Sequence, residues 1–167
     1  MVGDPVARMA FKLGDEYALK ISKLATNSAS VAKKAIYAGA KIVADEIKNN
    51  IQNLPEENFR YLHDGDKFIG ITPQQKKDLG DSFGIAPISQ DKDGSWNTKL
   101  GFDGYGSFKT AKYPNGLPNQ LLARAIESGS SVREKWPFVR PAVNKTKKAA
   151  TAAMQEVIDE ETKKIMK

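Results

Sequence analysis

The sequence predicts an α+β fold in which a small, mostly antiparallel sheet is packed by a long N-terminal helix and a long C-terminal helix. Apolar residues recur every three or four positions over residues 32–54, and a second series of this kind runs from residue 141 toward the end of the chain. Two β-like runs lie between these series, on either side of an Asp-Gly pair. A chain of 167 residues is expected to form a single domain over residues 1–167.

The first long helix is expected over residues 28–54. Its apolar stripe is formed by Ala32, Ile36, Gly39, Ala40, Val43, Ile47, Ile51 and Leu54. A capping residue at positions 26–28 can accept a free backbone N–H at its start, and Pro55 favours its end. The small residues of this helix allow a second backbone to approach closely. Before it, the sequence predicts a flexible arm over residues 1–12 and a short helix over residues 15–25.

The middle of the chain predicts a short helix followed by a hairpin. Thr72, Pro73 and Gln75 form the pattern of a capping box, which predicts a helix that ends near Gly80. The runs Ser82–Ser89 and Ser95–Phe102 are β-like, and the Asp-Gly pair at 93–94 is typical of a tight turn. Residues 103–119 are rich in Gly and Pro, so we expect an extended loop there.

Two further helices are predicted after this loop. Asn119 is expected to cap a helix that runs through Glu127, with Leu122, Ala125 and Ile126 buried. Gly129 is expected to close this helix in a left-handed conformation. The terminal helix is expected over residues 141–166, beginning at Pro141.

The residue inventory favours a protein without catalytic, metal or cofactor sites. No cysteine is present, and His63 is the single histidine, so a catalytic triad or a cluster of imidazole ligands cannot be built elsewhere. A hydrolase centred on His63, Asp64 and Asp66 stays open as a third alternative. The Asp91–Gly94 stretch starts like a calcium loop but lacks the later acidic ligands, and no phosphate-binding loop is present.

A net charge of +6 keeps a small basic nucleic-acid-binding protein open as an alternative. Charged and aromatic residues are interleaved in two segments, Lys109, Lys112 and Tyr113 in one and Arg133, Lys135 and Trp136 in the other. Most other lysines fall on predicted helices, where a solvated face explains them. No apolar run is long enough to span a bilayer, so we expect a soluble protein with no membrane partner.

Several segments resemble one known family. Residues 119–131 read Asn-Gln-Leu-Leu-Ala-Arg-Ala-Ile-Glu-Ser-Gly-Ser-Ser, and residues 137–142 read Pro-Phe-Val-Arg-Pro-Ala ahead of the terminal amphipathic series. With the stretches at 38–44, 80–87 and 97–104, they are similar to the gene-product-ten tail-component family of lambdoid phages. The likeness covers roughly residues 32–165. One departure is Ser130, where the family pattern commonly has Thr after Gly.

The resemblance implies a structural virion protein at the head–tail junction of a long-tailed bacteriophage, in the neck or in tail completion. Such a protein is not an enzyme, and it is assembled in the bacterial cytoplasm. Its partners would be copies of itself in a ring, by analogy sixfold, and neighbouring neck, tail terminator or tail tube proteins, with DNA near in the channel. A tail terminator that caps the tube is the nearest alternative.

The candidate assembly residues lie in two places. Around the Pro-Phe-Val-Arg-Pro element they are Glu127, Gly129, Pro137, Phe138, Arg140 and Pro141, and in the 103–119 loop they are Tyr105, Phe108 and Tyr113. The two prolines restrict the backbone around Phe138 and Arg140. Phe138 is expected either to fill the core or to enter an interface, and Arg140 is expected to pair with Glu127 or a helix end.

Overall fold

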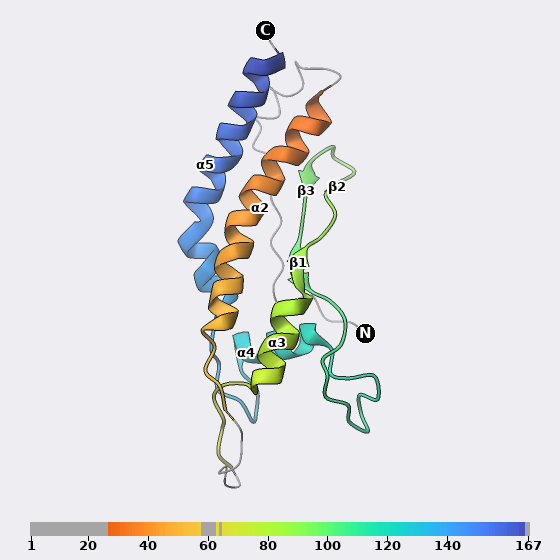
Figure 1. Ribbon diagram of the computed structural model, residues 1–167, viewed down its shortest axis with the longest axis vertical. Coiled ribbons are helices and arrows are strands. Elements are labelled where there is room, and N and C mark those ends of the chain that lie inside the picture. The colour runs from red at the N-terminus through yellow and green to blue at the C-terminus, as the bar shows by residue number, and fades with distance from the viewer. Residues whose placement is uncertain (1–26, 58–62, 64, 166–167) are drawn as a thin grey trace. The chain divides into compact units, whose positions relative to one another are not determined.

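A computed structural model describes residues 27–57, 63 and 65–165 of the chain. Along this part of the chain two helices come first, four short strands follow, and two further helices come last (Figure 1), and this separation of helices from strands confirms the α+β class. In order they are α2 (Ser28–Gln52), α3 (Pro73–Ser82), β1 (Phe83–Ile85), β2 (Ser89–Gln90), β3 (Trp96–Asn97), β4 (Leu100–Phe102), α4 (Asn119–Ser128) and α5 (Val139–Ile165). The predicted arm and the predicted helix over residues 15–25 lie outside the described residues.

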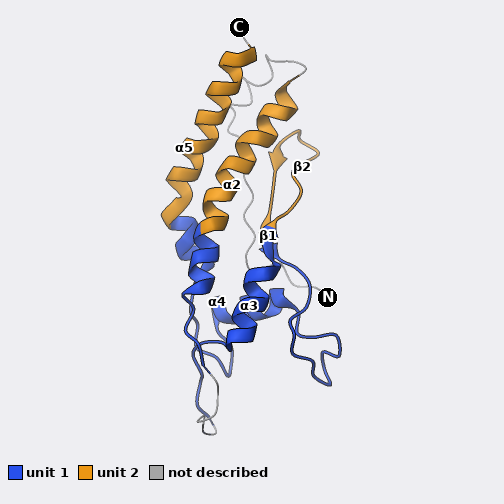
Figure 2. Cartoon of the chain, viewed as in Figure 1, with its two compact units in different colours: residues 1–8, 46–84, 101–144 blue, residues 9–45, 85–100, 145–167 orange. Residues whose placement is uncertain are grey.

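The chain divides into two compact units (Figure 2). Among the described residues, unit 1 contains 46–57, 63, 65–84 and 101–144, and unit 2 contains 27–45, 85–100 and 145–165. Neither unit is one continuous segment of the sequence. The single domain stays a prediction, and each unit is described by itself below.

In unit 2, α2 and α5 pack closely through small residues. The buried apolar side chains here are Val31, Ala32, Ala35, Ile36, Ala40, Val43 and Ala44 from α2 and Ala150, Met154 and Ile158 from α5. A Cβ atom on Gly39 would lie 2.6 Å from Met154 Cγ and 3.2 Å from the Ala150 carbonyl oxygen, so this contact favours glycine. The ammonium of Lys34 also pairs with the Glu161 carboxylate at 2.9 Å. The close helix approach expected from the sequence is therefore confirmed, and it is intramolecular.

The predicted hairpin is present, but each arm is divided into two short strands. β1 pairs with β4 and β2 pairs antiparallel with β3. Pro87 interrupts the first arm, where the Thr98 hydroxyl donates a hydrogen bond of 2.7 Å to the Ala86 carbonyl oxygen. Gly94 turns the chain with φ of 85°, as the Asp-Gly pair predicts.

In unit 1, the end of α2 and the start of α3 lie close to their predicted positions. α2 ends at Gln52, shortly before Pro55. The capping box is complete, because the Gln75 backbone N–H donates to the Thr72 hydroxyl oxygen and the Thr72 backbone N–H donates to the Gln75 side chain, both at 3.1 Å. α3 continues to Ser82, two residues past the predicted end at Gly80.

Three aromatic rings form the centre of the unit 1 core. The ring of Phe102 lies 5.0 Å from that of Phe83 and 6.1 Å from that of Phe138, measured between centroids, in tilted and edge-to-face arrangements. Leu79 of α3 and the α4 residues Leu122 and Ile126 are buried in the same unit.

The start of α4 differs from the prediction. Pro118 occupies the cap position without a side-chain hydrogen bond, and Asn119 is the first helical residue. The Asn119 amide instead donates to the Asp103 carbonyl oxygen at 3.0 Å, and its backbone N–H donates to the Gly104 carbonyl oxygen at 3.1 Å. Asn119 thus joins the two ends of the preceding loop. Ala123 is buried in α4, whereas the predicted Ala125 is only half-buried.

The C-terminal end of α4 lies at Gly129, and the start of α5 lies two residues before Pro141. Gly129 has the positive φ, 77°, that favours glycine, but its ψ of 174° differs from the predicted left-handed helical conformation; its N–H donates to the Ala125 carbonyl oxygen at 2.8 Å. α5 begins at Val139 and not at the predicted Pro141, which lies in its first turn, where a missing N–H costs no helical bond.

Within the described residues, no helix combines the length and apolar character needed to cross a bilayer.

Candidate interaction surface

Glu127, one of the candidate assembly residues, is the N-terminal cap of α5. Its side chain is only 5% exposed. One carboxylate oxygen accepts the backbone N–H of Phe138 at 2.7 Å and of Val139 at 2.9 Å, and the other accepts the N–H of Arg140 at 3.0 Å. These N–H groups have no acceptor within the helix, and a negative charge at a helix N-terminus is favourable. Both oxygens of the Glu127 carboxylate thus accept backbone hydrogen bonds, and the role of this side chain is structural.

The predicted ion pair between Arg140 and Glu127 is wrong. Glu127 meets the backbone of Arg140, and the Arg140 side chain is exposed. The reason is that the first turn of α5 offers free N–H groups, which compete for the carboxylate from close range. Pro137 and Pro141, which lie before and after Arg140 in the sequence, are also exposed.

Phe138 has the first of the two positions expected for it, because it fills the core. Its side chain is 2% exposed. The Asn50 amide donates to its carbonyl oxygen at 2.9 Å, and Glu127 accepts its N–H, so the backbone on both sides of the ring is held. The ring is therefore unavailable on the surface of the chain.

Arg133 is also occupied within unit 1. Its guanidinium donates to the Gly70 carbonyl oxygen and lies 4.4 Å from the centre of the Phe68 ring. The side chain is buried, and burial lowers the pKa of its guanidinium, which stays charged at neutral pH. Of the two basic and aromatic segments, the one that contains Arg133 therefore cannot use this side chain to bind a phosphate.

The 103–119 segment, from here on the 103–118 loop, holds the most exposed aromatic residue in the part of the chain that the structure describes. Tyr105 is 62% exposed and Phe108 is 47% exposed, while Tyr113 is half-buried. Between α4 and β4 this loop has no helix or strand, as predicted, but it is ordered by backbone hydrogen bonds. The Gly106 N–H donates to the Leu117 carbonyl oxygen at 2.7 Å, and the Leu117 N–H donates to that of Phe108 at 3.1 Å.

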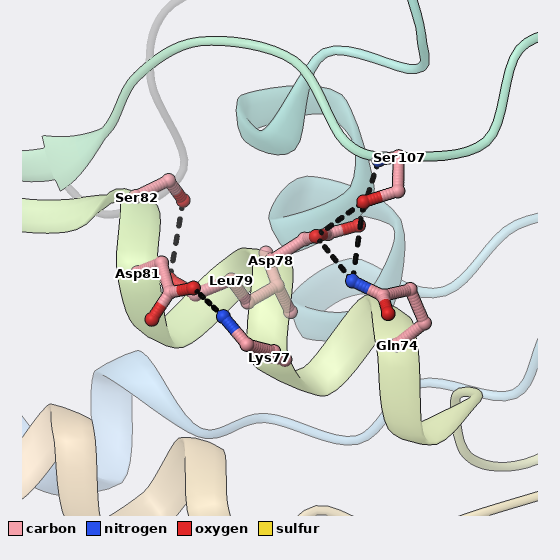
Figure 3. A network of polar contacts seen from close by, with 7 residues as sticks. All are labelled: Gln74, Lys77, Asp78, Leu79, Asp81, Ser82 and Ser107. Carbon is pink, nitrogen blue, oxygen red and sulfur yellow. Dashed lines mark hydrogen bonds and ion pairs between the residues drawn. The ribbon is translucent and has the colours of Figure 1, made fainter.

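A polar network holds this loop on α3 (Figure 3). The Asp78 carboxylate accepts the Ser107 N–H and the Ser107 hydroxyl, each at 2.8 Å, and the Gln74 amide at 2.9 Å. Burial on its own would raise the pKa of Asp78, but the hydrogen bonds from Ser107 and Gln74 and the charge of Lys77 hold this pKa below its ordinary value. The loop is thus fixed in one conformation near its exposed rings.

Exposed large apolar side chains gather in unit 1. They are Ile69, Tyr105, Phe108, Leu121, Val132 and Trp136, whereas Tyr37 is the one from unit 2 among the described residues. Single exposed apolar residues are ordinary, but five of these six lie in the segments between helices and strands of one unit, where exposed side chains are placed to meet a partner. We call these six residues the apolar set of unit 1. Sequence reasoning named Tyr105 and Phe108 as assembly candidates and Trp136 in a segment considered for nucleic-acid binding, and it missed Ile69, Leu121 and Val132.

The residues considered for chemistry do not form a reactive centre in the described part of the chain. His63 is exposed, and its backbone N–H donates to the Asp66 carboxylate at 3.1 Å. Asp64 lies outside the described residues. Asp93 accepts the Ser95 N–H at 2.9 Å, which is the bond of a turn. The described residues contain no group of three or more acidic, histidine or cysteine side chains placed to hold a metal ion.

Comparison of the chain with protein families, with curated proteins and with solved structures gave no match. The resemblance to phage tail components therefore stays a prediction from the sequence.

Proposed function

We propose that the chain is a structural protein that acts by packing against other protein chains, in the neck or tail-completion part of a long-tailed bacteriophage. The observation that carries the first part is the apolar set of unit 1. The particular place at the head–tail junction rests on the resemblance of residues 119–142 to phage tail components.

The geometry of the 103–118 loop suits an interface. Tyrosine and phenylalanine bring large contact areas with few rotatable bonds, so their burial against a partner costs little side-chain entropy. Asp78 fixes the backbone next to Tyr105 and Phe108 through Ser107 before any partner arrives. A loop ordered in advance avoids part of the entropy cost of binding.

Identical copies in a ring would use different surfaces on the two sides of each contact. Such heterologous contacts close when the rotation between neighbours is a whole fraction of a turn. The neighbours above and below the ring would be other neck proteins, a tail terminator or the tail tube. DNA passes through the centre of such assemblies, and the net charge of +6 is compatible with DNA nearby.

The direct test is the location and necessity of the protein in phage particles. We expect labelled protein to lie at the head–tail junction, and we expect its deletion to leave heads and tails unjoined. A deletion that still gives infectious, joined particles would rule the function out. Protein found only at the head-proximal end of free tails would identify the terminator alternative instead.

Nucleic-acid binding is separated by its response to salt. A protein that uses several lysines against phosphates loses affinity steeply between about 50 and 200 mM salt. The proposed function predicts self-association that depends on Tyr105 and Phe108. Tight, salt-sensitive binding of single-stranded DNA that is unaffected when both rings are replaced by Ala would favour the alternative.

A further inference from the structure

A pocket of about 430 Å³ lies between the end of α2 and α3, wholly within unit 1. Three lysines, Lys48, Lys76 and Lys77, line it together with one carboxylate, Asp81. Ile51 adds apolar surface to its wall. The pocket thus combines an excess of positive charge with a small apolar floor.

The lysines differ in how firmly they are held. Lys76 pairs with Glu56 at 2.9 Å and donates to the Gln52 carbonyl oxygen at 3.1 Å, so it is occupied. Lys77 pairs with Asp81 on the exposed surface, and such a pair opens at small cost. Lys48 is exposed and forms no ion pair with any residue that the structure describes. Lys48 and Lys77 are therefore available to an incoming carboxylate.

The same chain carries a matching acidic surface on α5. Glu156 and Glu160 are exposed, and four residues of helix bring their side chains to one face about 6 Å apart. Neither forms an ion pair with the described residues, whereas the neighbouring Glu161 is occupied by Lys34 and Lys164. Half-buried Val157 lies next to them and provides an apolar contact.

We propose that Glu156 and Glu160 of one copy dock in the Lys48 and Lys77 pocket of another copy. The inference rests on the proposed function and adds a second contact between neighbours in the ring, besides the one that uses Tyr105 and Phe108. It pairs two different surfaces of the same chain, which is the heterologous geometry that a ring requires. Opposite charges at the contact would also speed association and fix its register.

A nucleic acid fits this pocket less well than an acidic protein segment. No aromatic side chain of the described residues lines the pocket, so bases would find no stacking surface on this part of the chain. Any incoming anion has to displace Asp81 from its exposed pair with Lys77, so the missing stacking surface is the difference that disfavours a nucleic acid.

Reciprocal charge reversal in the full chain tests the contact. One variant carries Lys48→Glu with Lys77→Glu, the second carries Glu156→Lys with Glu160→Lys, and self-association is measured by sedimentation velocity and native mass spectrometry. Each variant alone is expected to associate at least about tenfold more weakly, because two ion pairs become repulsive. An equimolar mixture is expected to regain wild-type association in rings where the variants alternate, and the fourfold variant is expected to behave like the wild type.

A matched control is Lys92→Glu with Lys99→Glu, which makes the same change in net charge at exposed positions of unit 2 and is expected to leave association unchanged. Wild-type chains that stay monomeric at millimolar concentration overturn the inference. Equal rings from all variants, or no recovery in the mixture and the fourfold variant, also overturn it. Rings that form regardless of these charges leave the proposed function standing, whereas absence from particles removes that function separately.

Discussion

The two units are stabilised in different ways. In unit 2, α2 and α5 meet through alanines, Gly39 and a few larger side chains, and ion pairs such as Lys34 with Glu161 lie at the margin. In unit 1, buried polar groups hold the loops, and large apolar side chains are left on the surface. Close packing of regular helices makes a rigid part, whereas loops fixed by polar contacts can present side chains to a partner. The comparison predicts that within unit 1 the buried residues determine stability, whereas the exposed loop residues determine assembly.

The largest effect is expected from Phe138→Ala in the unit 1 core. Removing a ring that is 2% exposed should lower the free energy of unfolding by about 3–5 kcal/mol, because the cavity cannot close around Phe102. Chemical denaturation with a tryptophan fluorescence readout measures the loss. The matched variant is Phe108→Ala, expected to change stability by less than about 0.5 kcal/mol and to weaken self-association. The reverse pattern would contradict the separation.

Next in size is Glu127→Ala, which removes the cap of α5. We expect a loss of about 2–3 kcal/mol, because three buried or partly buried N–H groups lose their acceptor. Glu127→Gln keeps one acceptor oxygen and should lose less. Amide hydrogen exchange should show the opening in the first turn of α5 and around Phe138. Equal stability of both variants with the wild type would show that the cap is unimportant.

A smaller effect is expected in unit 2 from Gly39→Ala. The added methyl group meets Met154 Cγ and the Ala150 carbonyl oxygen, so the clash should exceed the gain in helix propensity by about 1–2 kcal/mol. Gly80→Ala is the control, because its added Cβ has no atom within 4 Å and the helix should gain about 0.5–1 kcal/mol. Thermal unfolding of both variants gives the comparison. A stabilised Gly39→Ala would disprove the tight helix contact.

The smallest effect concerns pH and the Asp78 carboxylate. Its pKa is lowered in the folded state, so its contribution is present above the unfolded value of about 4 and is lost as the pH falls through the folded pKa. The contribution should stay below about 1 kcal/mol because the group is partly exposed. The protection factor of the Ser107 amide, which is its exchange rate relative to the intrinsic rate at the same pH, should fall as the pH is lowered from 6 to 2.5. In Asp78→Asn this protection factor should be low already at pH 6, whereas Asp81→Asn should retain the wild-type profile.

Sequence reasoning succeeded where the determining residues are near one another along the chain. The capping box at Thr72 and the turn at Gly94 each depend on a few adjacent residues, and both are present. The stripe of α2 repeats over many turns, so its period is clear. These features defined the fold class and most helix boundaries.

The missed features join residues that are distant in the sequence. Glu127 caps a helix that begins twelve residues later, the Asp78 contact spans 29 residues, and the Arg133 contact with Gly70 spans 63. No local pattern encodes such pairs, since each partner has an ordinary alternative in its own neighbourhood. Asn119 illustrates this, because its capping propensity was outweighed by the carbonyl groups of residues 103 and 104.

The closure of the 103–118 loop by Asn119 has a consequence for how its tip can vary. Hydrogen bonds from Asn119 to the carbonyl groups of residues 103 and 104 hold the two ends of the loop together. We therefore expect the segment after Phe108 to tolerate deletion or replacement. Its length and composition can change without altering the helices that carry it. Replacements between Phe108 and Leu117 are therefore expected to leave the core of unit 1 unchanged.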